Sequence, residues 1–227
     1  MPLPFVPIFI VAIVFGGVLG GSVVSNWENI VYSLQGKKIV VLGAREVGKT
    51  TLLKYMERGI LIERYNQTLK KEQIERITLD DLKVRLKKTH DVSGDTAAYT
   101  EWKELFEEAD LVLYIVRTDM LLRRDTKTEE RIQADLQQIK RWSKKLGSKK
   151  QKQFFIVGNH WDSDPRFKNL TPDKIGNYLD EFRSLPVVEN MTLLVGGESQ
   201  VKVALGSLAT EKDAHTLIQT IFTQVKK

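Results

Sequence analysis

The feature that most constrains this chain is the stretch GAREVGKT, residues 43–50, which satisfies the spacing G-x-x-x-x-G-K-[S/T]. It directly follows the apolar run KIVVL and directly precedes TTLLKYME, so it is predicted to be a turn from a strand into a helix. In such a turn the backbone N–H groups surround a phosphate, the lysine bridges the β- and γ-phosphates, and the following hydroxyl binds Mg²⁺. A glycine-containing turn without a ligand is the plain alternative, and the flanking strand and helix disfavour it. The predicted phosphate-binding residues are Gly43, Glu46, Val47, Gly48, Lys49, Thr50 and Thr51.

Short apolar strands alternate with amphipathic helices along the rest of the chain. Residues 38–42, 111–116 and 153–157 are predicted to be buried parallel strands, because their apolar runs are continuous. The predicted helices are 49–58, 97–109, 128–146, 171–184 and 211–225. This alternation predicts an α/β domain with a doubly wound, mostly parallel sheet.

Two stretches interrupt the alternation and are predicted to be hairpins. Residues 72–92 resemble two strands joined at Asp80 and Asp81, which would add one antiparallel edge strand to the sheet. The stretches MTLLVGG and QVKVALGS, near the carboxyl terminus, resemble a second hairpin.

Three further motifs follow the phosphate loop. The stretch YNQT ends at Thr68, DVSGD spans residues 91–95, and GNHWD spans residues 158–162. Together with the phosphate loop, their order and spacing resemble a small GTPase of the Ras superfamily, and GKTTLLKYM is similar to the Arf-like branch. The resemblance covers residues 37–227 and implies a P-loop GTPase fold that binds GTP or GDP with Mg²⁺.

The resemblance implies roles for the two switch motifs. A threonine that closes over the γ-phosphate and Mg²⁺ corresponds to Thr68, and a tyrosine three residues earlier, which covers the nucleotide, corresponds to Tyr65. Asp91 is implied to hold Mg²⁺ through water, and the Gly94 N–H to contact the γ-phosphate. An ordinary polar loop with Thr78 in place of Thr68, and a hairpin-edge turn at DVSGD, are the alternatives. The implied metal ligands are Thr50, Thr68 and Asp91.

Two residues depart from the family pattern at catalytic positions. Asp95 stands where the family usually has a glutamine that orients the attacking water, and its carboxylate repels the phosphate oxygens unless a cation pairs with it. Arg45 stands where Ras has glycine; it compensates Asp95, contacts the γ-phosphate, or points to solvent. Asp95 and Arg45 are therefore the catalytic candidates, and slow intrinsic hydrolysis is predicted in each case.

The stretch GNHWD resembles the guanine-reading loop N-K-x-D of this family. The resemblance implies that Asp162 accepts hydrogen bonds from the guanine base, and that Asn159 ties this loop to the phosphate loop. His160 replaces the lysine whose stem lies over the base, and its ring offers a stacking surface instead. Adenine lacks both donors, so GTP is predicted to be preferred over ATP. A last nucleotide-contacting turn is expected at GSLAT, through Ser207 and Leu208, and GGES at residues 196–199 competes for this role.

Residues 2–24 contain no ionisable group. A helix from Pro7 to Trp27 would rise about 30 Å, the thickness of a hydrocarbon core. A secretory signal peptide or a buried helix is the alternative. In the next segment one helical face carries Trp27, Ile30, Val31 and Leu34. The predicted organisation is a transmembrane helix over 1–26, an interfacial linker helix over 27–36 and the GTPase domain over 37–227.

The charge distribution adds an expectation about orientation. The chain has a formal net charge of +6 and no cysteine, which excludes disulfides and thiolate metal sites. Seven basic residues lie in KRWSKKLGSKKQK, residues 140–152, without a recognisable nucleic-acid module. This loop enters a strand at the same pole as the linker at Lys38, so we expect it to face anionic headgroups rather than to be only a solvated helix end. Lys37 and Lys38 fit the positive-inside bias, which predicts a single-pass membrane protein with a cytosolic GTPase domain.

The layout of one amino-terminal helix followed by a small GTPase domain is similar to that of the β subunit of the signal recognition particle receptor. The expected function is a membrane-anchored GTP-binding switch with slow hydrolysis, which recruits or regulates protein partners at the cytosolic membrane face. The alternative is a non-hydrolysing, nucleotide-bound interaction or scaffold subunit of a membrane complex. An ATP-dependent enzyme would require Asp162 to play no part in base recognition.

Overall fold

A parallel sheet forms the centre of the molecule. The computed structural model describes residues 10–11, 34–58, 60–65, 72–77, 85–87, 96–147, 152–167, 171, 174–195 and 201–225. Within these residues the sheet has the order β1-β8-β7-β6-β2-β5, and every pairing in it is parallel. Its strands are β1 (Ile10–Val11), β2 (Lys38–Gly43), β5 (Arg85–Lys87), β6 (Leu111–Arg117), β7 (Gln153–Asn159) and β8 (Val201–Leu205).

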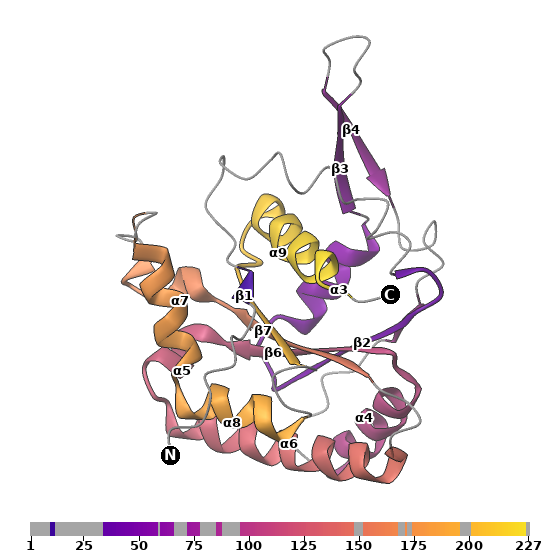
Figure 1. Cartoon of the computed structure of the whole chain (residues 1–227), viewed down its shortest axis with the longest axis vertical. Coiled ribbons are helices and arrows are strands. Elements are labelled where there is room, and N and C mark those ends of the chain that lie inside the picture. Colours follow the sequence, from indigo (N-terminus) through magenta and orange to yellow (C-terminus); the bar gives the residue numbers. More distant parts are fainter. Residues whose placement is uncertain are drawn as a thin grey trace, which may run out of the picture.

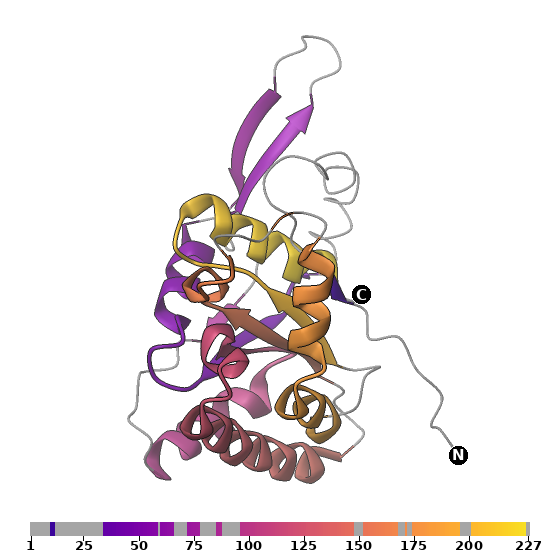
Figure 2. The ribbon, with the colours of Figure 1, turned by 90° about the vertical axis from the view of Figure 1, so that its left-hand side faces the viewer.

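Helices cover both faces of this sheet (Figure 1). Figures 1 and 2 show α3 and α9 on one face, and α4, α6 and α8 on the other. The helices are α3 (Lys49–Glu57), α4 (Thr96–Glu108), α5 (Thr118–Leu122), α6 (Thr126–Leu146), α7 (Ile175–Arg183), α8 (Pro186–Leu194) and α9 (Glu211–Thr223), with the short 3₁₀ helix η2 (Trp161–Ser163) after β7. The predicted α/β architecture with a parallel sheet is confirmed.

The central strands are apolar throughout because both of their faces are covered. From Leu111 to Val116 no residue of β6 is more than 1% exposed, and β2 and β7 are buried almost as completely. Side chains fix where two helices start: the Asp125 carboxylate accepts from the Thr128 N–H at 2.9 Å, and the Thr210 hydroxyl accepts from the Asp213 N–H at 3.2 Å. All of the helices predicted from hydrophobic periodicity are present, and their ends differ from the prediction by a few residues.

A buried carboxylate joins α4, β6 and α6. Asp135 is fully buried and accepts hydrogen bonds from the hydroxyls of Tyr99 and Tyr114, at 2.8 and 2.9 Å, and from Arg131 Nε at 2.8 Å. Burial, followed by the charge of Asp135, raises the pKa of Tyr99 to about 12. These contacts hold α4, the helix that follows the predicted second switch, against the core from Tyr99 onward.

The predicted hairpin over residues 72–92 is wrong. β4 (Glu72–Ile77) pairs antiparallel with the preceding strand β3 (Ile60–Tyr65), and this ribbon projects away from the main sheet (Figures 1 and 2). β5 instead pairs parallel with β2, so the predicted antiparallel edge strand is absent from the described part of the sheet. Asp80 and Asp81 lie outside the described residues.

The second predicted hairpin is also wrong in its first half. Met191–Leu194 belong to α8, whereas Val201–Leu205 form β8 as expected. Pro186 at the first turn favours a helix start, and Val187, Val188 and Met191 then form a buried helical face.

The amino-terminal segment departs from the expectation wherever it is described. Ile10 and Val11 form β1 against β8, so a helix that begins near Pro7 is wrong at these positions. Leu34, which was predicted on the apolar face of the interfacial linker helix, is fully buried in the domain core. No helix in the described ranges combines the length and the apolar character needed to cross a bilayer. Residues 1–9 and 12–33, including most of the predicted spanning and linker helices, lie outside the described residues.

Candidate functional site

The phosphate-binding loop joins β2 to α3 at the carboxyl end of the sheet, where ligands of doubly wound folds bind. Gly43 and Gly48 have φ values of +143° and +101°, which disfavour other residues. A Cβ at Gly43 would meet the Ile115 carbonyl at 2.5 Å, and one at Gly48 would collide with the Asn159 side-chain amide. The two glycines therefore let this loop approach β6 and β7 closely, as a cradle for a phosphate requires.

Two basic residues of the loop lie in opposite environments. Lys49 is 5% exposed, and its ammonium donates to the Ala44 carbonyl at 2.7 Å, so its charge is held inside the loop. Arg45 has a side chain 72% exposed, and within the described part of the chain it pairs with Glu46 at 3.9 Å. Of the readings left open by the sequence, this placement of Arg45 favours solvent. Thr50 and Thr51 follow Lys49 in the first turn of α3, where helix N–H groups have no intrahelical partner.

The guanine-reading motif is joined directly to the phosphate loop. The Asn159 side-chain amide donates to the Val47 carbonyl at 2.9 Å, although the two residues are 112 positions apart. This bond is the tie that the resemblance implied for Asn159.

The turn GSLAT completes the same end of the sheet. The Gly206 N–H donates to the Gly158 carbonyl at 2.9 Å, and the Ser207 hydroxyl accepts from the Ala209 N–H at 3.0 Å. Leu208 packs beside Gly48 of the phosphate loop. Ser207 and Leu208 are therefore brought to the predicted site, whereas GGES lies outside the described residues.

The carboxyl end of β6 supplies residues that the sequence analysis missed. Arg117 pairs with the buried Asp119 through two hydrogen bonds, at 3.0 and 2.7 Å, and lies beside Asn159 in the sheet register. The hydrogen bond to Asp119, together with the charges of Asp119 and Glu46, raises the pKa of Arg117 above its ordinary value. The position of this pair in the sequence could have indicated its role, because polar residues at the end of a buried parallel strand lie at the ligand-binding edge of the sheet.

Buried polar atoms gather at these strand ends. Among the described side chains, six buried nitrogen or oxygen atoms have no hydrogen-bond partner within the protein, and three of them are Thr118 Oγ1, Asn159 Oδ1 and His160 Nε2. These three lie at the adjacent ends of β6 and β7. Because a buried polar atom without a partner costs free energy, their concentration here is typical of a site for a polar ligand.

His160 takes a left-handed backbone conformation, with φ at +62°, that leads into η2. Trp161 is 5% exposed and packs against Phe167 and Tyr178, with ring centroids 5.0 and 6.4 Å apart. Asp162 follows in η2 and is half-buried. Trp161 thus anchors the loop in the core, while its two neighbours, His160 and Asp162, are half-buried.

In a comparison with protein-family models, the chain matches the ADP-ribosylation factor family (Arf) over residues 24–202. The match spans well over half of the 227 residues. The chain belongs to the ADP-ribosylation factor family. Members of this family bind GTP or GDP with Mg²⁺, and the ligand of this Arf-family chain is a guanine nucleotide.

Solved structures similar to this Arf-family chain include other GTP-binding proteins. The small COPII coat GTPase SAR1 from Encephalitozoon cuniculi, in complex with GDP, is 16% identical; the alignment covers 88% of this chain and 87% of that one, with a TM-score of 0.47. A GTP-binding protein from Sulfolobus solfataricus, also with GDP, is 14% identical over 89% of this chain and 56% of that one, with a TM-score of 0.48. A comparison with curated protein sequences gives no match. The family assignment rests on the family match rather than on these distant likenesses.

The remaining predicted site residues of the Arf-family chain are only partly placed. Thr68, Asp91, Gly94 and Asp95 lie outside the described residues. Tyr65 is the last residue of β3, in the ribbon that β3 forms with β4, and its predicted role in covering the nucleotide stays a prediction. The Mg²⁺ ligands implied among these residues stay predictions, and Thr50 is the one whose place at the start of α3 is described.

Proposed function

We propose that this Arf-family chain is a GTP-binding switch with slow intrinsic GTP hydrolysis, anchored to a membrane, where its GTP-bound form recruits or regulates protein partners. The main support for nucleotide binding is the Asn159–Val47 hydrogen bond, because it joins the phosphate loop and the base-reading loop into a single site. In this site Lys49 and the α3 N-terminus bind the phosphates, and Asp162 accepts from the base. Mg²⁺, held by Thr50 and the predicted ligands Thr68 and Asp91, would neutralise charge on the phosphates.

Slow hydrolysis follows from the residues that replace the family's catalytic groups. Asp95 places a carboxylate where the family has the neutral amide of a glutamine, and its charge repels the phosphate oxygens beside the attacking water unless a cation pairs with it. The exposed Arg45 side chain is paired weakly with Glu46 and is not directed at a phosphate by any described contact. Binding without efficient turnover is therefore the expected behaviour.

The first test identifies the nucleotide and its fate. Protein purified in detergent is expected to carry GDP or GTP, and single-turnover hydrolysis of GTP is expected to proceed at or below about 10⁻⁴ s⁻¹, the scale of intrinsic Ras hydrolysis. Chromatography of the released nucleotide and of the reaction products measures both. Asp95→Gln should raise the rate. GTP retained without turnover would favour the scaffold alternative, bound ATP would contradict base recognition, and rapid turnover would contradict the role given to Asp95.

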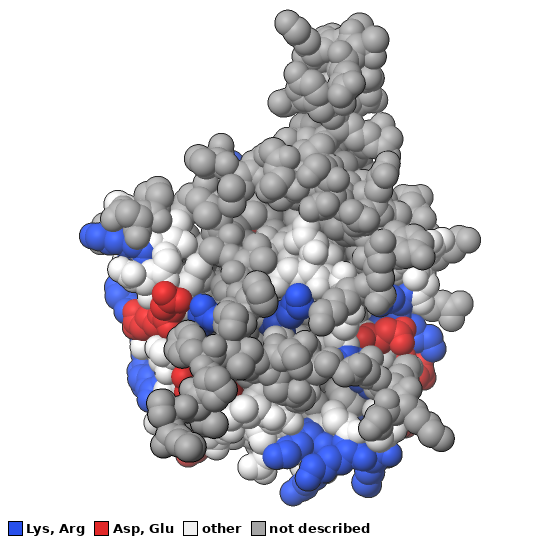
Figure 3. All heavy atoms as spheres, in the orientation of Figure 1, with Lys and Arg blue, Asp and Glu red and all other residues white. Residues whose placement is uncertain are grey.

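Membrane attachment is supported by the uncharged residues 2–24 and by charge at one pole of the domain. Figure 3 shows Lys and Arg side chains gathered over the end of α6, where Lys140, Arg141, Lys144 and Lys145 follow one another within two turns. This end lies at the amino ends of the strands: the Lys38 N–H donates to the Asp110 carboxylate at 2.9 Å, and the Gln153 N–H donates to the Asp110 carbonyl at 3.0 Å. The basic end of α6 would then face the bilayer, with the nucleotide on the far side.

The second test separates anchoring from surface contact. The full chain is expected to stay with the membrane after alkaline carbonate extraction. In nanodiscs with anionic lipid, the end of α6 is expected to be protected from hydrogen exchange relative to neutral nanodiscs. Replacing Lys140, Arg141, Lys144 and Lys145 by glutamine should abolish this protection without releasing the protein, because each basic residue near anionic headgroups contributes about 1 kcal/mol.

The matched control removes charge from the opposite pole, with glutamine at the exposed Lys127, Lys174 and Lys212, near the amino ends of α6, α7 and α9. It should leave the protection unchanged. Extraction of the wild-type chain by carbonate would contradict the anchor and would agree with Ile10 and Val11 forming a strand of the domain. Equal protection in the basic variant and the wild type would contradict the orientation.

A further inference from the structure

We propose that Asp164 and Arg166 are positioning residues for Asp162, and that their contacts to α7 set how strongly the site discriminates guanine from bases that lack one of its donors. The proposal deepens the proposed function and depends on guanine-nucleotide binding at this site. Neither residue belongs to the N-H-W-D motif, which ends two positions before Asp164.

Asp164 is a buried carboxylate directly after the base-reading loop. It is 4% exposed and accepts from the Arg166 N–H at 3.0 Å, from Arg166 Nη2 at 2.8 Å, and from the Tyr178 hydroxyl at 3.3 Å. Burial by itself raises the pKa of the Asp164 carboxyl, but the hydrogen bonds and charge of Arg166 outweigh burial, and the pKa lies below its ordinary value. Asp164 therefore stays ionised, and its bonds are charge-assisted.

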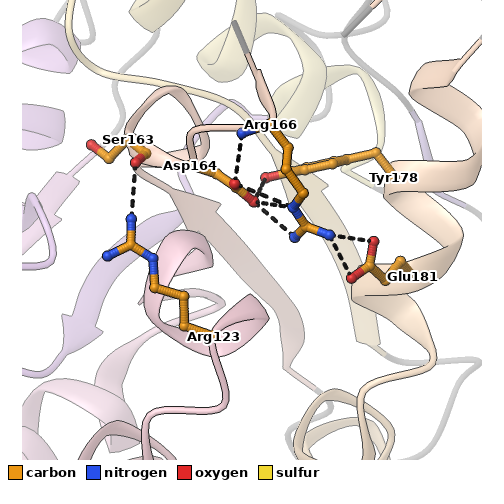
Figure 4. A network of polar contacts seen from close by, with 6 residues as sticks. All are labelled: Arg123, Ser163, Asp164, Arg166, Tyr178 and Glu181. Atoms are coloured by element: carbon orange, nitrogen blue, oxygen red, sulfur yellow. Dashed lines mark hydrogen bonds and ion pairs between the residues drawn. The ribbon is translucent and has the colours of Figure 1, made fainter. Parts of the chain in front are cut away.

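Arg166 connects this carboxylate to α7 (Figure 4). Its Nη1 donates to both carboxylate oxygens of Glu181, at 2.8 and 2.9 Å, while Nε and Nη2 contact Asp164. The guanidinium also lies over the Tyr178 ring, 5.6 Å from its centroid. One planar side chain thus bridges two carboxylates, a geometry that the point charge of a lysine does not reproduce.

The other flank of Asp162 is anchored by aromatic packing. Trp161 is buried against Phe167 and Tyr178, so the residue before Asp162 is also fixed by α7. The backbone closes between the two anchors, since the Asp164 N–H donates to the Trp161 carbonyl at 3.0 Å. Asp162 lies between a packed indole and a paired carboxylate, and both of these contact Tyr178.

The contacts of Asp164 and Arg166 should affect the discrimination between guanine and related bases more than the overall affinity for nucleotide. A carboxylate that accepts from two donors of one base must be placed within a fraction of an ångström, whereas phosphate binding occurs at a separate loop. Releasing Arg166 frees the Asp164 flank but leaves Trp161, Asn159 and the phosphate loop in place. The site should then still bind nucleotide, but GDP should lose the extra affinity that it gains from the exocyclic amine of guanine.

The test compares GDP with inosine diphosphate, whose base keeps N1–H and lacks the exocyclic amine. In the full-length, detergent-purified protein, Arg166→Gln is expected to lower the ratio of the two affinities by about tenfold. Arg166→Lys should lower it nearly as much, because lysine cannot span both carboxylates. Glu181→Gln, a milder change at a side chain 46% exposed, should lower it by about threefold. Calorimetric titration with each nucleotide measures the ratio.

The matched control is Asp180→Asn, which removes another ion pair of α7, that between Arg183 Nη1 and Asp180 Oδ1 at 3.3 Å. It should leave the ratio unchanged. If the Arg166 variants and Glu181→Gln weaken the binding of GDP and inosine diphosphate in equal proportion, Arg166 and Glu181 support only the fold and the proposal is overturned. Unchanged affinities for both nucleotides would overturn it as well. A wild-type protein that does not prefer GDP to ADP overturns the proposed function itself, which is a different result.

Discussion

Replacing Lys49 by alanine is expected to lower the affinity for GTP by about 10²- to 10³-fold, the largest loss of affinity from any single change in the phosphate loop. Lys49 is 5% exposed and its ammonium is already held inside the loop by the Ala44 carbonyl, so it meets the phosphates without further ordering. Removing one partner of a desolvated, hydrogen-bonded charge pair costs about 3–4 kcal/mol, which corresponds to this factor. Competition against a fluorescent GTP analogue measures the change.

The matched control for Lys49→Ala is Arg45→Ala, in the same loop and of the same charge. Because the Arg45 side chain is 72% exposed and its one ion pair among the described residues is a 3.9 Å contact to Glu46, its loss is expected to change the affinity by less than about threefold. Two outcomes would contradict this account of the loop: a Lys49→Ala protein that binds GTP within threefold of the wild type, or an Arg45→Ala protein that loses as much as the lysine variant.

Replacing Asp162 by asparagine is expected to exchange the preferred base from guanine to xanthine. A carboxylate only accepts, and it matches the N1–H and amine donors of guanine; an asparagine amide accepts from N1–H and donates to the carbonyl that xanthine carries in place of the amine. Affinity for GTP should fall by about 10⁴-fold, the scale at which sites built around hydrogen bonds reject a mismatched partner. Xanthosine triphosphate should then bind with an affinity close to that of GTP for the wild type.

His160→Asn is the contrasting variant for Asp162→Asn. Asparagine tolerates the left-handed backbone at position 160, where φ is +62°, so the change removes the ring without straining the loop. Affinities for GTP and xanthosine triphosphate should fall together, and their ratio should stay that of the wild type. A shifted ratio would show that the histidine, and not Asp162 alone, selects the base.

The parts of the fold that the sequence predicted well are those decided by local pattern. Continuous apolar runs identified β2, β6 and β7, because a strand covered on both faces has no polar positions to interrupt it. The pairing of β4 was not accessible in this way. Whether Glu72–Ile77 pairs with the strand before it or after it depends on contacts distant in sequence, and the hydrophobic pattern is compatible with both. The apolar stretch at Met191 was ambiguous for a related reason: short runs fit a strand or a buried helix equally well.

Some residues of the candidate site could likewise be predicted from local sequence, and others could not. The phosphate loop and Asn159 were predictable, because each belongs to a short motif with fixed spacing. Arg117 with Asp119, and Asp164 with Arg166, carry no such motif; they were found only because the fold places them at the carboxyl ends of β6 and β7. Leu34 was assigned from its helical spacing to an interfacial linker helix, whereas its side chain is buried in the domain core, a contact that local spacing does not reveal.

The Asn159–Val47 bond and the Gly206–Gly158 bond have a consequence for how the chain matures on the ribosome. The lysine-bearing loop is translated more than a hundred residues before its partner Asn159, and Leu208 follows later still. A nascent chain that stops short of β8 therefore lacks part of its pocket wall. A guanine nucleotide can therefore stabilise the complete site only after β8 and the turn that follows it have been synthesised, which places nucleotide binding late in the folding of this domain.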